Sequence, residues 1–144
     1  MAIASRYHIS VVHSPFLLDH VGDAFLALER PRQALQWYRR LAFEVRGSGW
    51  PKLEVAEAQA AQARAERSAF WQQRMRSEAK TSYEGYLATR DQDPRRRARA
   101  YVELGNLESV DDHPAVARRY YRLALEKRPG DPAATAALAA LEAK

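Results

Sequence analysis

The sequence contains no cysteine, which excludes disulfide bonds, thiolate metal sites and cysteine nucleophiles. Glycine is also scarce, with 6 residues among 144, and β-branched residues are few. Alanine, leucine, arginine and glutamate are abundant instead, and these residues favour helix over strand. The composition therefore predicts an all-α fold, and the length predicts a single domain that spans residues 1–144.

Long hydrophobic runs are absent as well. No apolar stretch approaches the roughly 20 residues that cross a bilayer, and Arg6, His8 and His13 interrupt the start of the chain, which therefore does not resemble a secretory signal. We expect no membrane span and a cytoplasmic location. The periplasm is the alternative, for a mature exported domain.

Recognisable catalytic motifs are missing. The sequence has no His-Glu-x-x-His pair, no glycine-rich phosphate loop and no Gly-x-Ser-x-Gly elbow. Its 4 histidines do not have the spacing of metal ligands or catalytic groups, and Asp111 and Asp112 precede a helix, where they are typical of a turn and a cap. We predict that the chain is not an enzyme and has no catalytic residue, metal site or cofactor.

The clearest pattern lies between Ala98 and Pro129, which predicts two amphipathic helices joined by a short polar turn. Gly105 and Ala117 are small enough for two helix backbones to approach closely, and Tyr121 is large enough to fill the space beside them. Because each helix has one apolar face, the two faces are expected to pack against each other as a helical hairpin.

This pattern resembles the tetratricopeptide repeat, a helical hairpin that stacks into arrays. The matching positions are Tyr101-x2-Leu104-Gly105 followed by Ala117-x3-Tyr121-x2-Ala124-x4-Pro129. The resemblance implies antiparallel helical hairpins stacked as a short right-handed superhelix with a C-terminal capping helix. Glu108 departs from the family, which usually has an aromatic residue three positions after the glycine.

A second copy of the hairpin starts near Ser14-Pro15, where proline takes the first helical position. Ala34 and Tyr38 follow Gly22 at the offsets by which Ala117 and Tyr121 follow Gly105. Phe25 fills the aromatic position that is missing from the later copy.

The middle of the chain is a degenerate third copy, which ends with the spacing Ser82-x3-Tyr86-x2-Thr89-x4-Pro94. Proline and glycine are absent from Lys52 to Glu84, so we predict one long helix from Lys52 to Ser77 with a weak turn at residues 78–81. Its alanine face is expected to pack against residues 1–12 or against a second chain. The alternative is one unbroken helix to Thr89, which would produce a domain-swapped dimer. The alanine face consists of Ala56, Ala60 and Ala63.

The predicted organisation therefore has five parts. They are an N-terminal arm (1–13), repeat 1 (14–46), an irregular repeat with a long first helix (51–94), repeat 3 (95–129) and a capping helix (131–144).

In the family, the first helices of the repeats line a concave groove, and the resemblance implies that their outward residues bind a partner. A clamp for carboxylates is not expected, because Asp19 and Asp23 replace its first lysine and asparagine. Trp71 is either an anchor for a partner or a core residue, and Phe70 beside it is expected to need burial. The implied groove residues are Asp19, His20, Asp23, Arg64, Arg67, Trp71, Arg74, Arg99 and Asn106.

We therefore predict a protein-interaction scaffold or chaperone-like adaptor that binds a peptide or a partner helix of mixed charge. One alternative is a basic surface for nucleic acid or another polyanion, formed by arginines at 95–99 and 118–122. It is the weaker reading, because few aromatic residues interleave these arginines. The other alternative is a homo-oligomerisation module that pairs through the long helix, with a homodimer as its simplest form.

Overall fold

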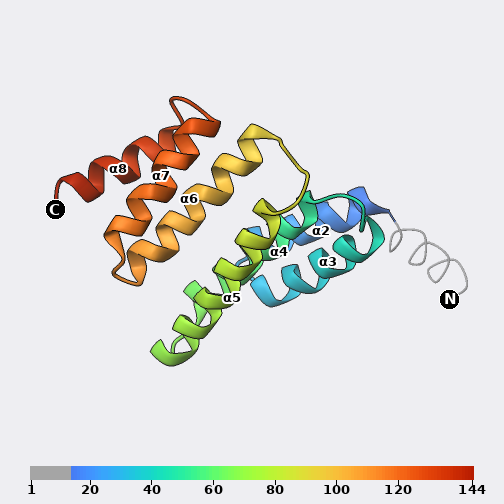
Figure 1. Cartoon of the computed structure of the whole chain (residues 1–144). Helices are drawn as coiled ribbons and strands as arrows, with labels where there is room; N and C mark the ends of the chain where they lie inside the picture. Colours follow the sequence, from blue (N-terminus) through green and yellow to red (C-terminus); the bar gives the residue numbers. More distant parts are fainter. Residues whose placement is uncertain (1–13) are drawn as a thin grey trace, which may run out of the picture. The chain divides into compact units, whose positions relative to one another are not determined.

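The computed structural model describes residues 14–144 (Figure 1), and the predicted N-terminal arm lies outside this range. Within it the chain forms seven α-helices and no strand, which confirms the all-α fold class. None of these helices has the length and hydropathy of a membrane span.

The chain divides into two compact units, with the boundary between Ala79 and Lys80. The N-terminal unit contains α2 (Pro15–Ala27), α3 (Pro31–Glu44), α4 (Trp50–Ala65) and the first part of α5 (Ala69–Leu87). The C-terminal unit contains the rest of α5, α6 (Pro94–Val110), α7 (Pro114–Lys127) and α8 (Pro132–Glu142). The grouping of all residues into one domain stays a prediction.

Proline marks the start of most helices. It takes one of the first two positions in α2, α3, α4, α6, α7 and α8, where its missing N–H group has no helical partner to lose. Only α5 starts without one in the described part of the chain. Six of the seven described helices therefore carry their start signal in the sequence.

The N-terminal hairpin, α2 and α3, closes around Gly22 and Tyr38. Tyr38 is fully buried together with Leu18, Ala34 and Leu41. A Cβ atom on Gly22 would lie 2.3 Å from the Tyr38 ring, so only glycine allows this approach. The small-against-large packing predicted from the spacing is confirmed here.

The C-terminal hairpin, α6 and α7, repeats this arrangement. Tyr121 is buried, and a Cβ atom on Gly105 would lie 2.4 Å from its ring. The capping helix α8 packs against α7 (Figure 1) and places Ala134 in the same cluster, with Leu138 and Leu141 packed against it. The predicted C-terminal capping helix is confirmed.

The prediction for the middle of the chain is wrong at one point. The helix that starts near residue 50 ends at Ala65, and after a turn at residues 66–68 the helix α5 continues without a break through residues 78–81. The long helix from Lys52 to Ser77 is therefore not formed, nor is the unbroken helix to Thr89 that would require a swapped dimer.

Local hydrogen bonds account for this turn. The side chain of Glu66 accepts from the backbone N–H groups of Arg67 (2.9 Å) and Ser68 (3.2 Å). The Gln72 side-chain amide donates to the Glu66 carbonyl oxygen at 2.6 Å. These bonds satisfy backbone groups that a helix would otherwise use, so the chain turns without glycine or proline. The alanine face of α4 (Ala56, Ala60 and Ala63) is buried within the chain itself.

Candidate functional site

The outward face of α2 carries three of the residues that the repeat register assigns to a groove, namely Asp19, His20 and Asp23, together with the exposed Phe16. Phe16 is 68% exposed, and its ring lies 4.0 Å from that of the exposed His20. One turn further, carboxylate oxygens of Asp19 and Asp23 lie within 4.8 Å of each other and of a carboxylate oxygen of Glu54 on α4. This spacing suits a cation or a basic side chain, and the predicted absence of a metal site stays a prediction.

The acidic group changes the chemistry of the buried tyrosine beneath it. The Tyr38 hydroxyl donates to Asp23 Oδ1 at 2.6 Å. Burial, this hydrogen bond and the negative charges of Asp23, Glu54 and Asp19 raise the pKa of Tyr38 well above its ordinary value. Asp23 is therefore partly a structural residue of the hairpin, because one of its oxygens holds the packing tyrosine.

A second group of predicted residues gathers where α4 ends and α5 begins. We call this surface the aromatic corner; it comprises Arg64, Arg67, Phe70, Trp71 and Arg74. Phe70 is 65% exposed and Trp71 is 48% exposed, with their rings edge to face at 5.2 Å. The guanidinium carbon of Arg74 lies 5.8 Å from the centre of the Trp71 ring, within cation–π range.

The sequence left open whether Trp71 is an anchor for a partner or a core residue, and its exposure in the aromatic corner bears on this choice. About half of its surface is accessible, and the expected burial of Phe70 is wrong. Arg64, at the end of α4, and Arg67, in the turn before α5, are both exposed. The corner thus joins two large apolar side chains to arginines, a combination that is enriched at the energetic centres of protein interfaces.

The two remaining predicted residues belong to the C-terminal unit. Arg99 and Asn106 are both exposed on α6. The side-chain oxygen of Asn106 accepts from the Tyr121 hydroxyl at 2.8 Å, which is the bond that Asp23 makes to Tyr38 in the first hairpin. A single groove that includes these residues and α2 stays a prediction.

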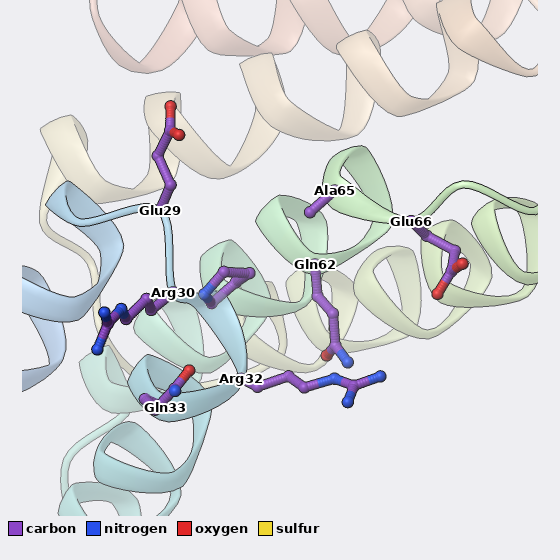
Figure 2. A pocket seen from close by; sticks show the side chains of 8 residues that line it. Glu29, Arg30, Arg32, Gln33, Gln62, Ala65 and Glu66 are labelled. Atoms are coloured by element: carbon purple, nitrogen blue, oxygen red, sulfur yellow. The ribbon is translucent and has the colours of Figure 1, made fainter.

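A cavity opens between the α2–α3 turn and the end of α4. It consists of two adjoining parts, of about 300 and 460 Å³, which share Glu29, Pro31 and Ala65. Figure 2 shows the side chains of Arg32 and Gln62 extending into the same region from α3 and α4, while Arg30 points away from them. Leu26, Pro31, Ala61 and Ala65 supply its apolar lining, and Arg64 lies at its edge.

Sequence reasoning missed several of these residues. Glu54 lies 31 positions after Asp23 on a different helix, so no sequence pattern indicated that it approaches Asp19 and Asp23. Arg32 and Gln62 are 30 positions apart, and only the turn at residues 66–68 fixes where α4 ends beside α3. The one local signal for that turn was Ser68, since serine is a preferred residue before a helix.

No protein-family model and no curated protein matches the sequence. Solved structures do match the fold. The tetratricopeptide-repeat (TPR) domain of Arabidopsis OM64 matches with a TM-score of 0.73 at 14% identity, over 92% of this chain and 98% of that one.

Two further structures carry bound peptides. The second TPR domain of human RPAP3, in complex with an HSP70 peptide, has a TM-score of 0.68 at 14% identity and covers 91% of this chain and 100% of its own. The Yersinia enterocolitica type III secretion chaperone SycD, in complex with a peptide of the translocator YopD, has a TM-score of 0.67 at 14% identity, covering 88% and 90%. The chain therefore has the fold of TPR domains, as the resemblance of its hairpins implied.

Proposed function

We propose that this chain is a protein-interaction module that binds a peptide segment of a partner protein and carries out no catalysis. The fold is shared with TPR domains, and two of the structures similar to it hold peptides of HSP70 and of YopD. Fold alone does not define a ligand, so the proposal depends on the surface chemistry of this chain.

The exposure of Phe70 and Trp71 carries the proposal. Four of the tyrosines between residues 14 and 144 are buried, namely Tyr38, Tyr83, Tyr86 and Tyr121. Leaving two large rings in water forgoes the free energy of burying them, roughly 25 cal/mol for each Å² of apolar surface. A partner that covers Phe70 and Trp71 would recover it, and Arg74 already stands over the tryptophan ring. We infer that the aromatic corner anchors the partner.

The face of α2 supplies a second, differently charged contact. Phe16 offers an apolar surface next to the acidic group of Asp19, Asp23 and Glu54. A partner that spans both surfaces would need basic residues at one end and acidic residues at the other. This agrees with the mixed-charge peptide predicted from the sequence.

Binding to nucleic acid or self-association through α4 is less well supported. The long helix on which self-association depended is not formed, and the alanine face of α4 is buried within the chain. Two of the arginines at 95–99 are occupied: Arg96 pairs with Asp91 at 2.7 Å, and buried Arg97 donates to the carbonyl oxygens of Leu87 and Asp91. Fewer charges remain there for phosphates.

A matched pair of double variants tests the proposal. Phe43 and Arg46 form the same kind of exposed cation–π pair, with 63% exposure of the ring and 4.9 Å between the guanidinium carbon and the ring centre. They lie at the end of α3, outside the corner. Proteins captured from the source lysate should be lost with Trp71→Ala, Arg74→Ala and retained with Phe43→Ala, Arg46→Ala. Equal retention or equal loss with both pairs would disprove the assignment.

A further inference from the structure

We propose that the cavity between the α2–α3 turn and the end of α4 binds an acidic segment of the partner, with one carboxylate at Arg32, another at Arg64, and an apolar side chain on the cavity floor. This inference rests on the proposed function and adds a site that the repeat register does not assign. Only Arg64 belongs to both the aromatic corner and the cavity.

The two arginines have no partner within the described chain. Neither the guanidinium of Arg32 nor that of Arg64 makes an ion pair or a hydrogen bond with another residue between 14 and 144. A guanidinium presents its N–H groups in a fork that matches the two oxygens of a carboxylate, and such pairs are among the stronger hydrogen bonds in proteins. Both side chains therefore have unused donors at the cavity.

The backbone at the start of α3 adds to this preference. The first residues of α3, Pro31, Arg32 and Gln33, line the cavity, and no side chain in the described part of the chain caps the helix. The first N–H groups of a helix point outward and carry a partial positive charge. A carboxylate held by Arg32 would therefore lie near uncapped amides as well.

The floor and the rim favour a peptide over a phosphate polymer. The apolar lining is aliphatic, from Leu26, Pro31, Ala61 and Ala65, and among residues 14–144 no aromatic ring lines the cavity on which a base could stack. Glu29 and Glu66 also line the cavity, and their charges would repel a dense chain of phosphates more than the separate carboxylates of a peptide. A peptide suits this rim better, since its backbone N–H groups can donate to carboxylates. Glu66 already accepts two backbone amides of its own turn.

The test uses the full chain labelled with ¹⁵N and a defined probe, N-acetyl-Leu-Glu-Leu-Glu amide, followed by NMR. We expect the amide signals of Arg32, Gln33 and Ala65 to shift, and the neutral probe N-acetyl-Leu-Gln-Leu-Gln amide to bind about tenfold more weakly. Arg32→Gln should weaken binding of the acidic probe by a similar factor. The matched control is Arg39→Gln, an exposed arginine of the same helix outside the cavity, which should leave the affinity unchanged.

Equal affinity for the neutral probe, or equal loss with Arg39→Gln, would overturn the inference. So would tighter binding of polyuridylate than of the acidic peptide at the same amides, because the site would then serve phosphates. Trp71→Ala should leave these shifts in place. If Trp71→Ala abolishes partner capture while Arg32→Gln does not affect the probe, the proposed function stands and the cavity assignment fails.

Discussion

The two hairpins α2/α3 and α6/α7 share one packing contact, between a glycine and a buried tyrosine, but differ in the polar groups around it. In each, a glycine lets a buried tyrosine lie against the helix backbone, and the next residue accepts a hydrogen bond from the tyrosine hydroxyl. That acceptor is the carboxylate of Asp23 in the first hairpin and the amide of Asn106 in the second. The steric part is thus repeated, while the charge differs between the units.

The two hairpins differ more in the residue that stands three positions after each glycine. Phe25 packs against the core of the first hairpin. Glu108 takes this position in the second hairpin and pairs with Lys80 at 3.1 Å and with His113 at 2.7 Å, and Lys80 also binds Asp111. The side chains of Lys80, Glu108 and Asp111 are all less than a fifth exposed. An apolar contact in one repeat is therefore replaced by a mostly buried ion cluster in the other.

The largest expected effect on stability comes from disrupting the shared glycine–tyrosine contact. Gly22→Ala and Gly105→Ala would each place a methyl group well inside the van der Waals radius of a buried tyrosine ring. We expect each to lower the free energy of unfolding by about 3 kcal/mol or more, because the ring must leave its position. Urea unfolding of the two variants measures this.

Gly85→Ala is the control for that experiment. Gly85 lies inside α5, and a Cβ atom there would meet nothing within 4 Å. Alanine favours helix over glycine by about 1 kcal/mol, so this variant should be more stable than the wild type. If Gly105→Ala lowered the free energy of unfolding no more than Gly85→Ala does, the close contact between Gly105 and Tyr121 would not exist in the second hairpin.

The ion cluster should make the stability of the second hairpin depend on the charge of a lysine, and therefore on pH. Lys80→Met leaves two mostly buried carboxylates without their cation, and we expect a loss of about 2 kcal/mol near neutral pH. Burial lowers the pKa of Lys80, but the hydrogen bonds that its ammonium donates to Asp111 and Glu108 outweigh this and raise the pKa above its ordinary value.

A raised lysine pKa fixes the sign of the effect. The ammonium is more stable in the folded chain, so its contribution is complete below the ordinary pKa of about 10.4 and is lost as the pH rises through the folded-state value. The stability difference between wild type and Lys80→Met, measured by urea unfolding, should therefore shrink in alkali. A difference that stayed constant from neutral pH to alkali would contradict the pairing.

The smallest effect should separate the two tyrosine acceptors. Tyr38→Phe removes a hydrogen bond to a charged acceptor, for which we expect a loss of about 1.5 kcal/mol, and Tyr121→Phe removes one to a neutral amide, for about 1 kcal/mol. Unfolding of both variants under the same conditions gives the order. A larger loss for Tyr121→Phe would show that the charge of Asp23 does not strengthen its bond.

The sequence predicted the two outer hairpins well because each signal was local. Proline starts their helices, and the glycine and tyrosine stand at spacings that only a hairpin explains. The turn before Ala69 could not be predicted in this way, because its backbone groups are satisfied by the side chains of Glu66 and Gln72 and by no turn residue. The candidate site could not be predicted for the same reason, because the exposure of Phe70 and the cavity at Arg32 both depend on where α4 ends.

The most direct test of the aromatic corner is a site-specific photocrosslink in the full chain. Benzoylphenylalanine is placed at position 71 in one protein and at position 43 in another, where the exposed ring of Phe43 is the matched control. After irradiation in the source lysate, a defined partner should be joined covalently to position 71 and not to position 43. The same adducts at both positions, or none at position 71, would contradict the account.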